Sequence, residues 1–308
     1  MVEPTPSYRP NPSQPKLRLP VGACDAHVHV FGPGKVFPYA PGAPYIPADA
    51  PKEKLFALHA MLGIKHCVIV QSSTHRFDNS AAADAISAKH GDYCGIALAP
   101  TTISDADLQA LHRQGFRGVR FNFMQHLGSG SKIEDVIALS KRLSPLGMHL
   151  QVHFESSMVH ELAPWFRKSA VPVLIDHMGR VDASRGVDQP DFRALLDLLK
   201  DERMLVKVSG SERCSKQAPP WRDAVPFAVK LVAEFGQRTL WGTDWPHPNL
   251  KQVPDDGAAG RPARGNRALG GAAPGAARRQ SAALLRLYSA LKPIALTTAA
   301  HFFCSCAM

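Results

Sequence analysis

Two histidines separated by one residue, His27 and His29, lie at the end of an apolar segment near the start of the chain. Side chains alternate along a strand, so residues i and i+2 point the same way and both rings enter one space. Asp244 follows another apolar segment much later in the chain, between Trp241 and His247. If both segments are strands of one barrel, two imidazoles and a carboxylate meet at its mouth, and these are groups that bind metals or move protons.

Two further histidines, His153 and His177, follow other apolar segments. This cluster supports two mechanisms. One divalent metal such as Zn²⁺ could lower the pKa of a bound water, with ligands from His27, His29, His153, His177 and Asp244. Alternatively, imidazoles polarise a substrate carbonyl while Asp244 accepts a proton from water. Residues 117–123 contain no lysine that carbamylation could turn into a bridge between two metals, which argues against a binuclear centre.

Two arginines, Arg120 and Arg213, also follow apolar segments. Arginine binds carboxylates through two parallel hydrogen bonds, so two of them at one mouth predict a dianionic substrate. The alternative is that each pairs with a nearby acid, such as Glu155 or Glu212. The other side chains that we expect to contact the substrate are Tyr45, in the long proline-rich loop 32–50, and polar residues near the segment ends: Ser73, His75, Asn122, His126, His153 and His247.

Eight short apolar segments predict the strands that position these residues: 23–31, 66–73, 93–100, 117–123, 149–154, 171–179, 204–210 and 239–247. Helix-like stretches separate them, near 52–62, 79–90, 104–114, 132–146, 157–168, 190–201 and 222–235. This alternation predicts an α/β protein with a (β/α)8 barrel. A doubly wound open sheet is the rival, but only a closed barrel brings the first and eighth strands together.

The chain divides into three parts by composition. Residues 1–20 are proline-rich and predict an extended arm, and residues 21–257 predict the catalytic barrel. Residues 258–308 form an atypical basic tail rich in Ala, Gly and Arg, with six Arg, one Lys and no acidic residue. A disordered tail is one interpretation. The other is a shift of the reading frame near residue 257 that removes the usual eighth helix, and sequencing the coding DNA distinguishes the two.

The net charge of +10 comes mostly from that tail, since the other 257 residues carry 29 basic and 26 acidic groups. The charge therefore does not predict nucleic-acid binding. The six cysteines form no regular framework, and the N-terminal segment lacks the pattern of a secretory signal. We therefore expect a cytoplasmic protein. The longest late apolar stretch is interrupted by Arg286, Lys292 and Pro293, so we expect no contact with a membrane.

Several motifs together carry a family resemblance: His27-x-His29 followed by Val30-Phe31-Gly32-Pro33, then Asp78-Asn79, Arg117-Gly118-Val119-Arg120-Phe121-Asn122-Phe123, Asp176-His177-Met178-Gly179-Arg180 and Trp241-Gly242-Thr243-Asp244-Trp245-Pro246-His247. Over about residues 15–257 the chain resembles the 2-pyrone-4,6-dicarboxylate lactonases of the amidohydrolase superfamily. These enzymes hydrolyse a cyclic ester to 4-oxalomesaconate in bacterial breakdown of aromatic compounds, without a metal.

The resemblance implies a role for each matching residue. Asp244 would be the general base, and His27, His29 and His177 would stabilise the oxyanion. Arg120 and Arg213 would bind carboxylates, with Tyr45 and Ser73 nearby. Two positions depart from the family: His126 replaces an arginine, and His153 replaces a tyrosine and restores a ligand that metal-dependent relatives use.

The function predicted from the sequence is therefore a lactonase, a carboxylic ester hydrolase that acts on a small anionic lactone without a cofactor. One alternative is a metal-dependent amidohydrolase or decarboxylase. Another is a different lactonase of the same superfamily, acting on a sugar acid or a muconolactone. A third, non-enzymatic alternative is a barrel that lacks its last helix and serves only as a binding scaffold.

Overall fold

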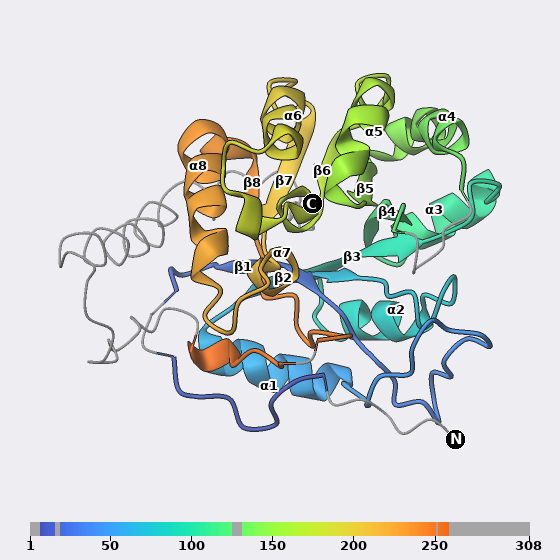
Figure 1. Ribbon diagram of the computed structural model, residues 1–308. Coiled ribbons are helices and arrows are strands. Elements are labelled where there is room, and N and C mark those ends of the chain that lie inside the picture. Colours follow the sequence, from blue (N-terminus) through green and yellow to red (C-terminus); the bar gives the residue numbers. More distant parts are fainter. Residues whose placement is uncertain (1–6, 16–18, 125–130, 251, 259–308) are drawn as a thin grey trace, which may run out of the picture.

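Figure 1 shows the computed structural model, which describes residues 7–15, 19–124, 131–250 and 252–258. Eight parallel strands pair in sequence order. Their bounds are β1 Cys24–Val28, β2 His66–Val70, β3 Tyr93–Leu98, β4 Phe116–Asn122, β5 His149–His153, β6 Val173–Ile175, β7 Met204–Val208 and β8 Thr239–Trp241. All eight predicted strands are present, and they lie inside the predicted segments or within one residue of them.

A β-bridge and several hydrogen bonds join the first strand, β1, to the segment that follows the last strand, β8. Val28 forms a parallel bridge with Trp245, and the Asp244 amide donates to the His27 carbonyl at 2.9 Å. The buried Asp25 carboxylate accepts from the Thr243 amide at 3.0 Å and from its hydroxyl at 2.6 Å. These contacts bring β8 back to β1, which confirms the predicted (β/α)8 barrel and excludes the open sheet.

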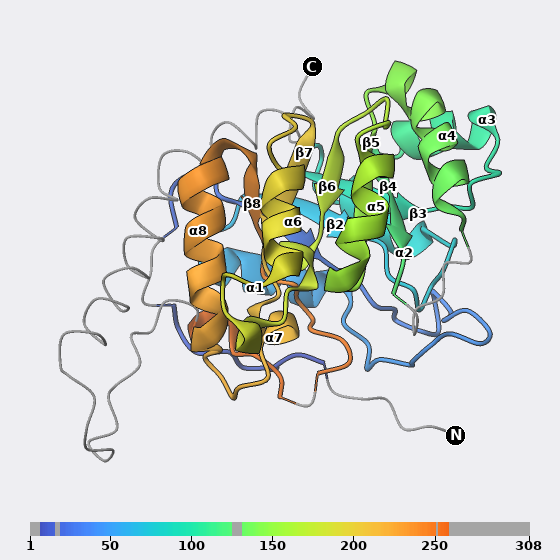
Figure 2. The same cartoon turned by 45° about the horizontal axis from the view of Figure 1, so that its top comes forward.

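Helices surround the strands (Figure 1), and Figure 2 shows α5, α6 and α8 standing next to one another outside the sheet. Their bounds are α1 Lys52–Leu62, α2 Ser80–Ser87, α3 Asp105–Arg113, α4 Ile133–Leu143, α5 Val159–Phe166, α6 Pro190–Leu198, α7 Ser211–Cys214 and α8 Val225–Phe235. The Ser104 hydroxyl caps α3 by accepting from the Asp107 amide at 3.1 Å. None of the helices in the described part of the chain is long and apolar enough to span a membrane.

Within the described residues, only the short 3-10 turn Asp256–Ala258 follows β8. The predicted tail lies beyond it, and apart from Ala258 its residues fall outside the described ranges. The division at residues 20 and 257 and the frameshift hypothesis therefore stay predictions.

The barrel interior changes character along its axis. Small apolar side chains fill one layer, including Ala26, Val68, Ile96 and Leu240. Nearer the carboxyl ends of the strands the inward-facing residues include the buried polar side chains Arg120 on β4, Gln151 on β5 and Lys207 on β7. Arg120 and Gln151 both donate to Asp176, and Lys207 donates to Gln151. Active sites of such barrels lie at this end. The fold therefore directs the search for a site to the carboxyl ends of the strands.

Candidate active site

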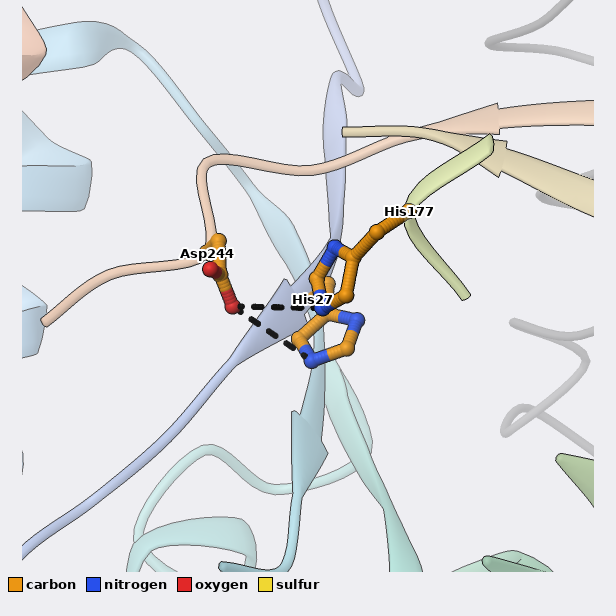
Figure 3. Close-up of side chains that lie close together, drawn as sticks. All are labelled: His27, His177 and Asp244. Atoms are coloured by element: carbon orange, nitrogen blue, oxygen red, sulfur yellow. Dashed lines mark ion pairs between the residues drawn. The ribbon is translucent and has the colours of Figure 1, made fainter. Parts of the chain in front are cut away.

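One oxygen of Asp244 faces three imidazoles at the carboxyl end of the barrel. Asp244 Oδ1 lies 3.6 Å from Nε2 of His27, 3.5 Å from Nε2 of His29 and 3.7 Å from Nε2 of His177. Figure 3 shows His27 and His177 reaching Asp244 from different elements. All four side chains are buried. The structure therefore brings together the four residues predicted to be catalytic, while their roles stay predictions.

Two of these residues sit where the backbone leaves the extended strand conformation. His177 has φ +50° and Asp244 has φ +65°, a left-handed region that costs free energy in residues other than glycine and is enriched at functional sites. These turns also explain why β6 and β8 end well before the predicted limits of 179 and 247. A Cβ at Gly210 would lie 2.6 Å from Nδ1 of His177, so glycine is needed there for the ring to fit.

A cavity of about 210 Å³ opens beside this cluster. Of the predicted site residues, its lining includes His29, Tyr45, Ser73, Arg120, His153, His177, Arg213 and Asp244. Tyr45 comes from the proline-rich segment 32–50, and burial raises the pKa of its hydroxyl to about 12. It therefore faces the cavity as a neutral hydrogen-bonding group.

Three guanidinium groups line the cavity, and two of them are paired with aspartates. Arg120 Nε donates to Asp176 Oδ2 at 2.8 Å, and Arg213 Nε donates to Asp244 Oδ2 at 2.5 Å. Each arginine thus pairs with an acid, as the alternative expected, but the acids are Asp176 and Asp244 rather than Glu155 and Glu212. Arg180, which the sequence analysis did not single out, is the third. The cavity is therefore suited to an anionic ligand.

A short chain of hydrogen bonds orients His153. Asn122 donates from Nδ2 to the Ser73 hydroxyl at 3.3 Å and accepts at Oδ1 from Nδ1 of His153 at 3.2 Å. Burial and the charge of Arg120 hold the pKa of His153 well below its usual value, so the ring is neutral. Its Nε2 has no partner among the described residues and is available to a ligand.

The structure does not bring every predicted residue to the cavity, and His27, His75, Asn122 and His247 are absent from its lining. His75 donates from Nδ1 to the Pro38 carbonyl at 3.1 Å and accepts at Nε2 from the Gly32 amide at 3.3 Å. It therefore holds the 32–50 segment in place. His247 pairs through Nε2 with Asp256 Oδ1 at 2.9 Å, outside the cavity lining. His126 lies outside the described residues.

The charges within the cluster follow from burial and from Arg213. Burial lowers the pKa of His27 to about 3 and holds the pKa of His177 well below its usual value. Burial alone would raise the pKa of Asp244, but the charge of Arg213 keeps it well below the ordinary value. The cluster therefore combines an ionised carboxylate with neutral imidazoles at His27 and His177.

Beneath the cluster lies a buried polar network that the sequence analysis missed. Lys207 Nζ lies 2.9 Å from Gln151 Oε1, 3.2 Å from His27 Nδ1 and 3.5 Å from Asp176 Oδ1. Gln151 in turn donates to Asp176 Oδ1 at 2.9 Å. The available signal was a single lysine within an otherwise apolar strand, Met204–Val208. Glu212, which lines the cavity, was considered only as a partner for an arginine.

The cluster contains a group that could hold a metal, since ligand atoms of His27, His177 and Asp244 lie within 4.8 Å of one another. The ligand types suit Zn²⁺, but the surrounding charges do not fit a bound cation. Asp244 is already neutralised by Arg213 at 2.5 Å, and Nδ1 of His27 faces the Lys207 ammonium at 3.2 Å. Histidines that bind metals ordinarily donate this second nitrogen's proton to an acceptor, and here the Asp176 carboxylate at 3.3 Å shares that position with the Lys207 ammonium.

Comparison with known proteins agrees with the fold. The family profile described as Amidohydrolase matches residues 24–272. The 2-pyrone-4,6-dicarboxylate hydrolase of Comamonas testosteroni is 44% identical over 80% of this chain and 84% of its own length. The 4-sulfomuconolactone hydrolase of Hydrogenophaga intermedia is 38% identical over 82% and 84%.

A solved structure shows the same architecture. The crystal structure of a candidate 2-pyrone-4,6-dicarboxylic acid hydrolase from Pseudomonas putida superposes with a TM-score of 0.71 at 29% identity, and the match covers 92% of this chain and 98% of that one. The resemblance inferred from the motifs is therefore confirmed over most of the chain. This protein belongs to the amidohydrolase family and is a hydrolase built on a (β/α)8 barrel.

Proposed function

We propose that this protein hydrolyses the lactone ring of a small dicarboxylate in the breakdown of aromatic compounds. The substrate that we expect is 2-pyrone-4,6-dicarboxylate, opened to 4-oxalomesaconate. The observation that carries the proposal is one cavity lined by Asp244, by two of its imidazoles, His29 and His177, and by three arginines, Arg120, Arg180 and Arg213. The 44% identity to a hydrolase of this lactone supports the choice of substrate.

In this proposal Asp244 activates water. Its carboxylate is ionised and Oδ1 has no hydrogen-bond partner among the described residues, so that oxygen is free to accept a proton. Water attacks the lactone carbonyl carbon as Asp244 takes its proton, and the carbonyl oxygen becomes an oxyanion. Collapse of this intermediate breaks the ring C–O bond and releases the ring oxygen as an enolate, which takes up a proton.

The three imidazoles around Asp244 differ in whether Nε2 accepts or donates a hydrogen bond. His29 donates from Nδ1 to the Val70 carbonyl, 2.7 Å away, so in its neutral form Nε2 carries a lone pair. This arrangement suits His29 to accept a hydrogen bond from the attacking water. His27 and His177 are left to stabilise the oxyanion, which requires a proton on Nε2.

The arginines bind the carboxylates of the substrate. Arg120 and Arg213 each use Nε on an aspartate, a contact that fixes the guanidinium plane. A planar dicarboxylate with two negative charges on its ring matches guanidiniums contributed by different elements, Arg120 by β4 and Arg213 by α7. Tyr45 and Ser73 line the same cavity and supply neutral hydrogen bonds.

The proposed reaction needs no metal. Arg213 and Lys207 support this, because their cations lie against Asp244 and against Nδ1 of His27. An aspartate or histidine bound to a metal would have a neutral or negative partner at these positions. The imidazole protons and Arg213 then supply the stabilisation of negative charge.

Hydrolysis of 2-pyrone-4,6-dicarboxylate, followed by loss of its ultraviolet absorbance, tests the proposal. 4-Sulfomuconolactone is a second candidate substrate, favoured by the 38% identical relative that hydrolyses it. We expect kcat/KM to be higher for the dicarboxylate, with Asp244→Asn as the inactive control. Folded protein that opens neither lactone would refute the proposal.

A further inference from the structure

Lys207 is a fully buried lysine that does not line the cavity, yet it contacts a predicted catalytic residue. Its ammonium lies against Nδ1 of His27 at 3.2 Å, on the side of the ring opposite Asp244. Transferring an ammonium from water to a protein interior costs several kcal/mol unless its protons are bonded. A role that depends on its contacts would account for its presence there.

The donors and acceptors around Lys207 can be matched one to one. An ammonium has three protons and accepts nothing. The three acceptors within reach are Gln151 Oε1 at 2.9 Å, His27 Nδ1 at 3.2 Å and Asp176 Oδ1 at 3.5 Å. If Nδ1 of His27 carried a proton, two donors would face each other and one buried N–H of Lys207 would lose its partner.

Asp176 is the competing partner for His27, because its Oδ1 lies 3.3 Å from Nδ1. This carboxylate is already supplied with donors, however. Arg120 donates to Oδ2 at 2.8 Å, and Gln151 donates to Oδ1 at 2.9 Å and to Oδ2 at 3.1 Å. Asp176 therefore keeps other donors when the His27 proton is on Nε2, whereas Lys207 would lose an acceptor if that proton were on Nδ1.

We propose that Lys207 is a positioning residue that keeps the proton of His27 on Nε2, on the side of the ring that faces Asp244 at the edge of the cavity. At 3.6 Å from Asp244 Oδ1, Nε2 is beyond an ordinary hydrogen bond, and it has no other partner among the described residues. Its proton is thus free to bind a developing oxyanion. The catalytic consequence of this inference rests on the proposed function, whereas the position of the His27 proton does not depend on it.

Lys207 also makes His27 differ from His29. The Val70 carbonyl holds the proton of His29 on Nδ1, so that its Nε2 accepts, whereas Lys207 reverses this arrangement in His27. One ring of the His-x-His pair is then suited to the attacking water and the other to the carbonyl oxygen. The pair requires both orienting contacts to act in this way.

Nitrogen-15 NMR of histidine-labelled wild-type protein tests the proton position directly, with His27→Gln identifying the His27 signals. We expect a protonated Nε2 and an unprotonated Nδ1. A protonated Nδ1 in the wild type overturns the proposal. This measurement needs neither substrate nor a Lys207 variant, so it decides the question even if Lys207→Met does not fold.

Lys207→Met removes the ammonium and keeps a side chain of similar length. We expect the His27 proton to move to Nδ1, where Asp176 accepts it. Changing a residue that orients a catalytic group costs about 10- to 100-fold in activity, so kcat should fall by that factor, with KM within about twofold because Lys207 does not line the cavity. An unchanged proton position together with unchanged kcat overturns the proposal.

Gln151→Leu is the matched control. It removes another partner of Lys207 from the same buried layer, together with one donor to Asp176, and leaves the ammonium beside His27. We expect the His27 proton to stay on Nε2. If both variants move it, disturbance of the layer explains the effect and the specific role of Lys207 is refuted. Wild-type protein that opens neither lactone refutes the proposed function instead, while its NMR spectrum still tests the proton position.

Discussion

Arg213 donates from Nε to Oδ2 of Asp244 at 2.5 Å and so leaves only Oδ1 of this carboxylate facing the imidazoles. Arg213 also donates to the Pro248 carbonyl at 3.1 Å, which fixes its guanidinium plane. The contact has two consequences. It sets which oxygen accepts a proton, and it keeps the carboxylate ionised although it is buried.

Arg213→Met should therefore change the pH dependence as well as the affinity. In the wild type the pKa of Asp244 is held well below its ordinary value, so activity should show no acid limb from this group between about pH 8 and about pH 5. Without Arg213, burial acts unopposed and the pKa of Asp244 rises. We expect an acid limb of kcat/KM to enter the measurable range; an unchanged pH profile would contradict this.

Arg120→Met separates substrate binding from the chemistry. A hydrogen bond to a charged group contributes about 1.5–3 kcal/mol, so loss of Arg120 should lower kcat/KM by about 10- to 100-fold. The effect should appear mainly in KM for a dicarboxylate. Steady-state kinetics with the two monocarboxylates that each lack one carboxylate of the substrate provides the control. The kinetics of one of these two compounds should no longer depend on Arg120. Equal kinetics in wild type and variant would assign Arg120 to its ion pair with Asp176 alone.

The sequence predicted the elements well because their signals are local. Apolar segments of strand length alternate with helix-like stretches, and each observed strand falls inside a predicted segment or within one residue of it. The sequence could not predict that β6 and β8 end early. Their ends depend on left-handed turns at His177 and Asp244, which the surrounding barrel imposes.

The site was predictable only in part for a related reason. His27 and Asp244 were found because strand ends of a barrel converge. The partners of Arg120 and Lys207 depend on which residues of β4, β5 and β7 share a layer inside the barrel, and sequence spacing does not define this. His75 follows its strand as expected, but the 32–50 segment folds back over it and occupies both ring nitrogens.

Chelation tests whether the reaction uses a metal. Because Arg213 and Lys207 place cations against Asp244 and His27, we expect turnover to be unchanged after dialysis against EDTA. Elemental analysis of the same sample should find less than one equivalent of zinc. Loss of activity on chelation that added Zn²⁺ restores would instead support the metal-dependent alternative.

Acid should destabilise the folded state well above the pKa of the carboxylates. His27 and His149 have a pKa of about 3 in the folded protein against 6.5 for the free side chain. As the pH falls below about 6.5, the unfolded chain binds protons that the folded protein does not. Each group then lowers the free energy of unfolding by up to about 1.4 kcal/mol per pH unit.

His247 acts in the opposite direction. Burial would lower its pKa, but Asp256 raises it above the ordinary value, so its contribution is present at low pH and is lost as the pH rises. Urea unfolding at several pH values measures how the free energy of unfolding changes with pH. His149→Gln should reduce the slope of that change by the contribution of one proton. Constant stability from about pH 7 to about pH 5 would contradict buried neutral histidines.

Asp244→Asn tests the central step. The amide keeps the size of the carboxylate but cannot accept a proton from water, and loss of a general base lowers kcat by at least about a hundredfold. The variant also leaves Arg213 without its anionic partner, and breaking a buried pair costs about 3–5 kcal/mol. Unfolding must therefore be measured alongside kcat.

Leu240→Val, in the apolar layer of the barrel interior, is a control for reduced stability. It should lower the free energy of unfolding without a comparable loss of turnover in the folded fraction. If Asp244→Asn retains near wild-type kcat while it remains folded, Asp244 is not the base. The proton acceptor would then have to be another group at the cavity, such as Nε2 of His29 or His153.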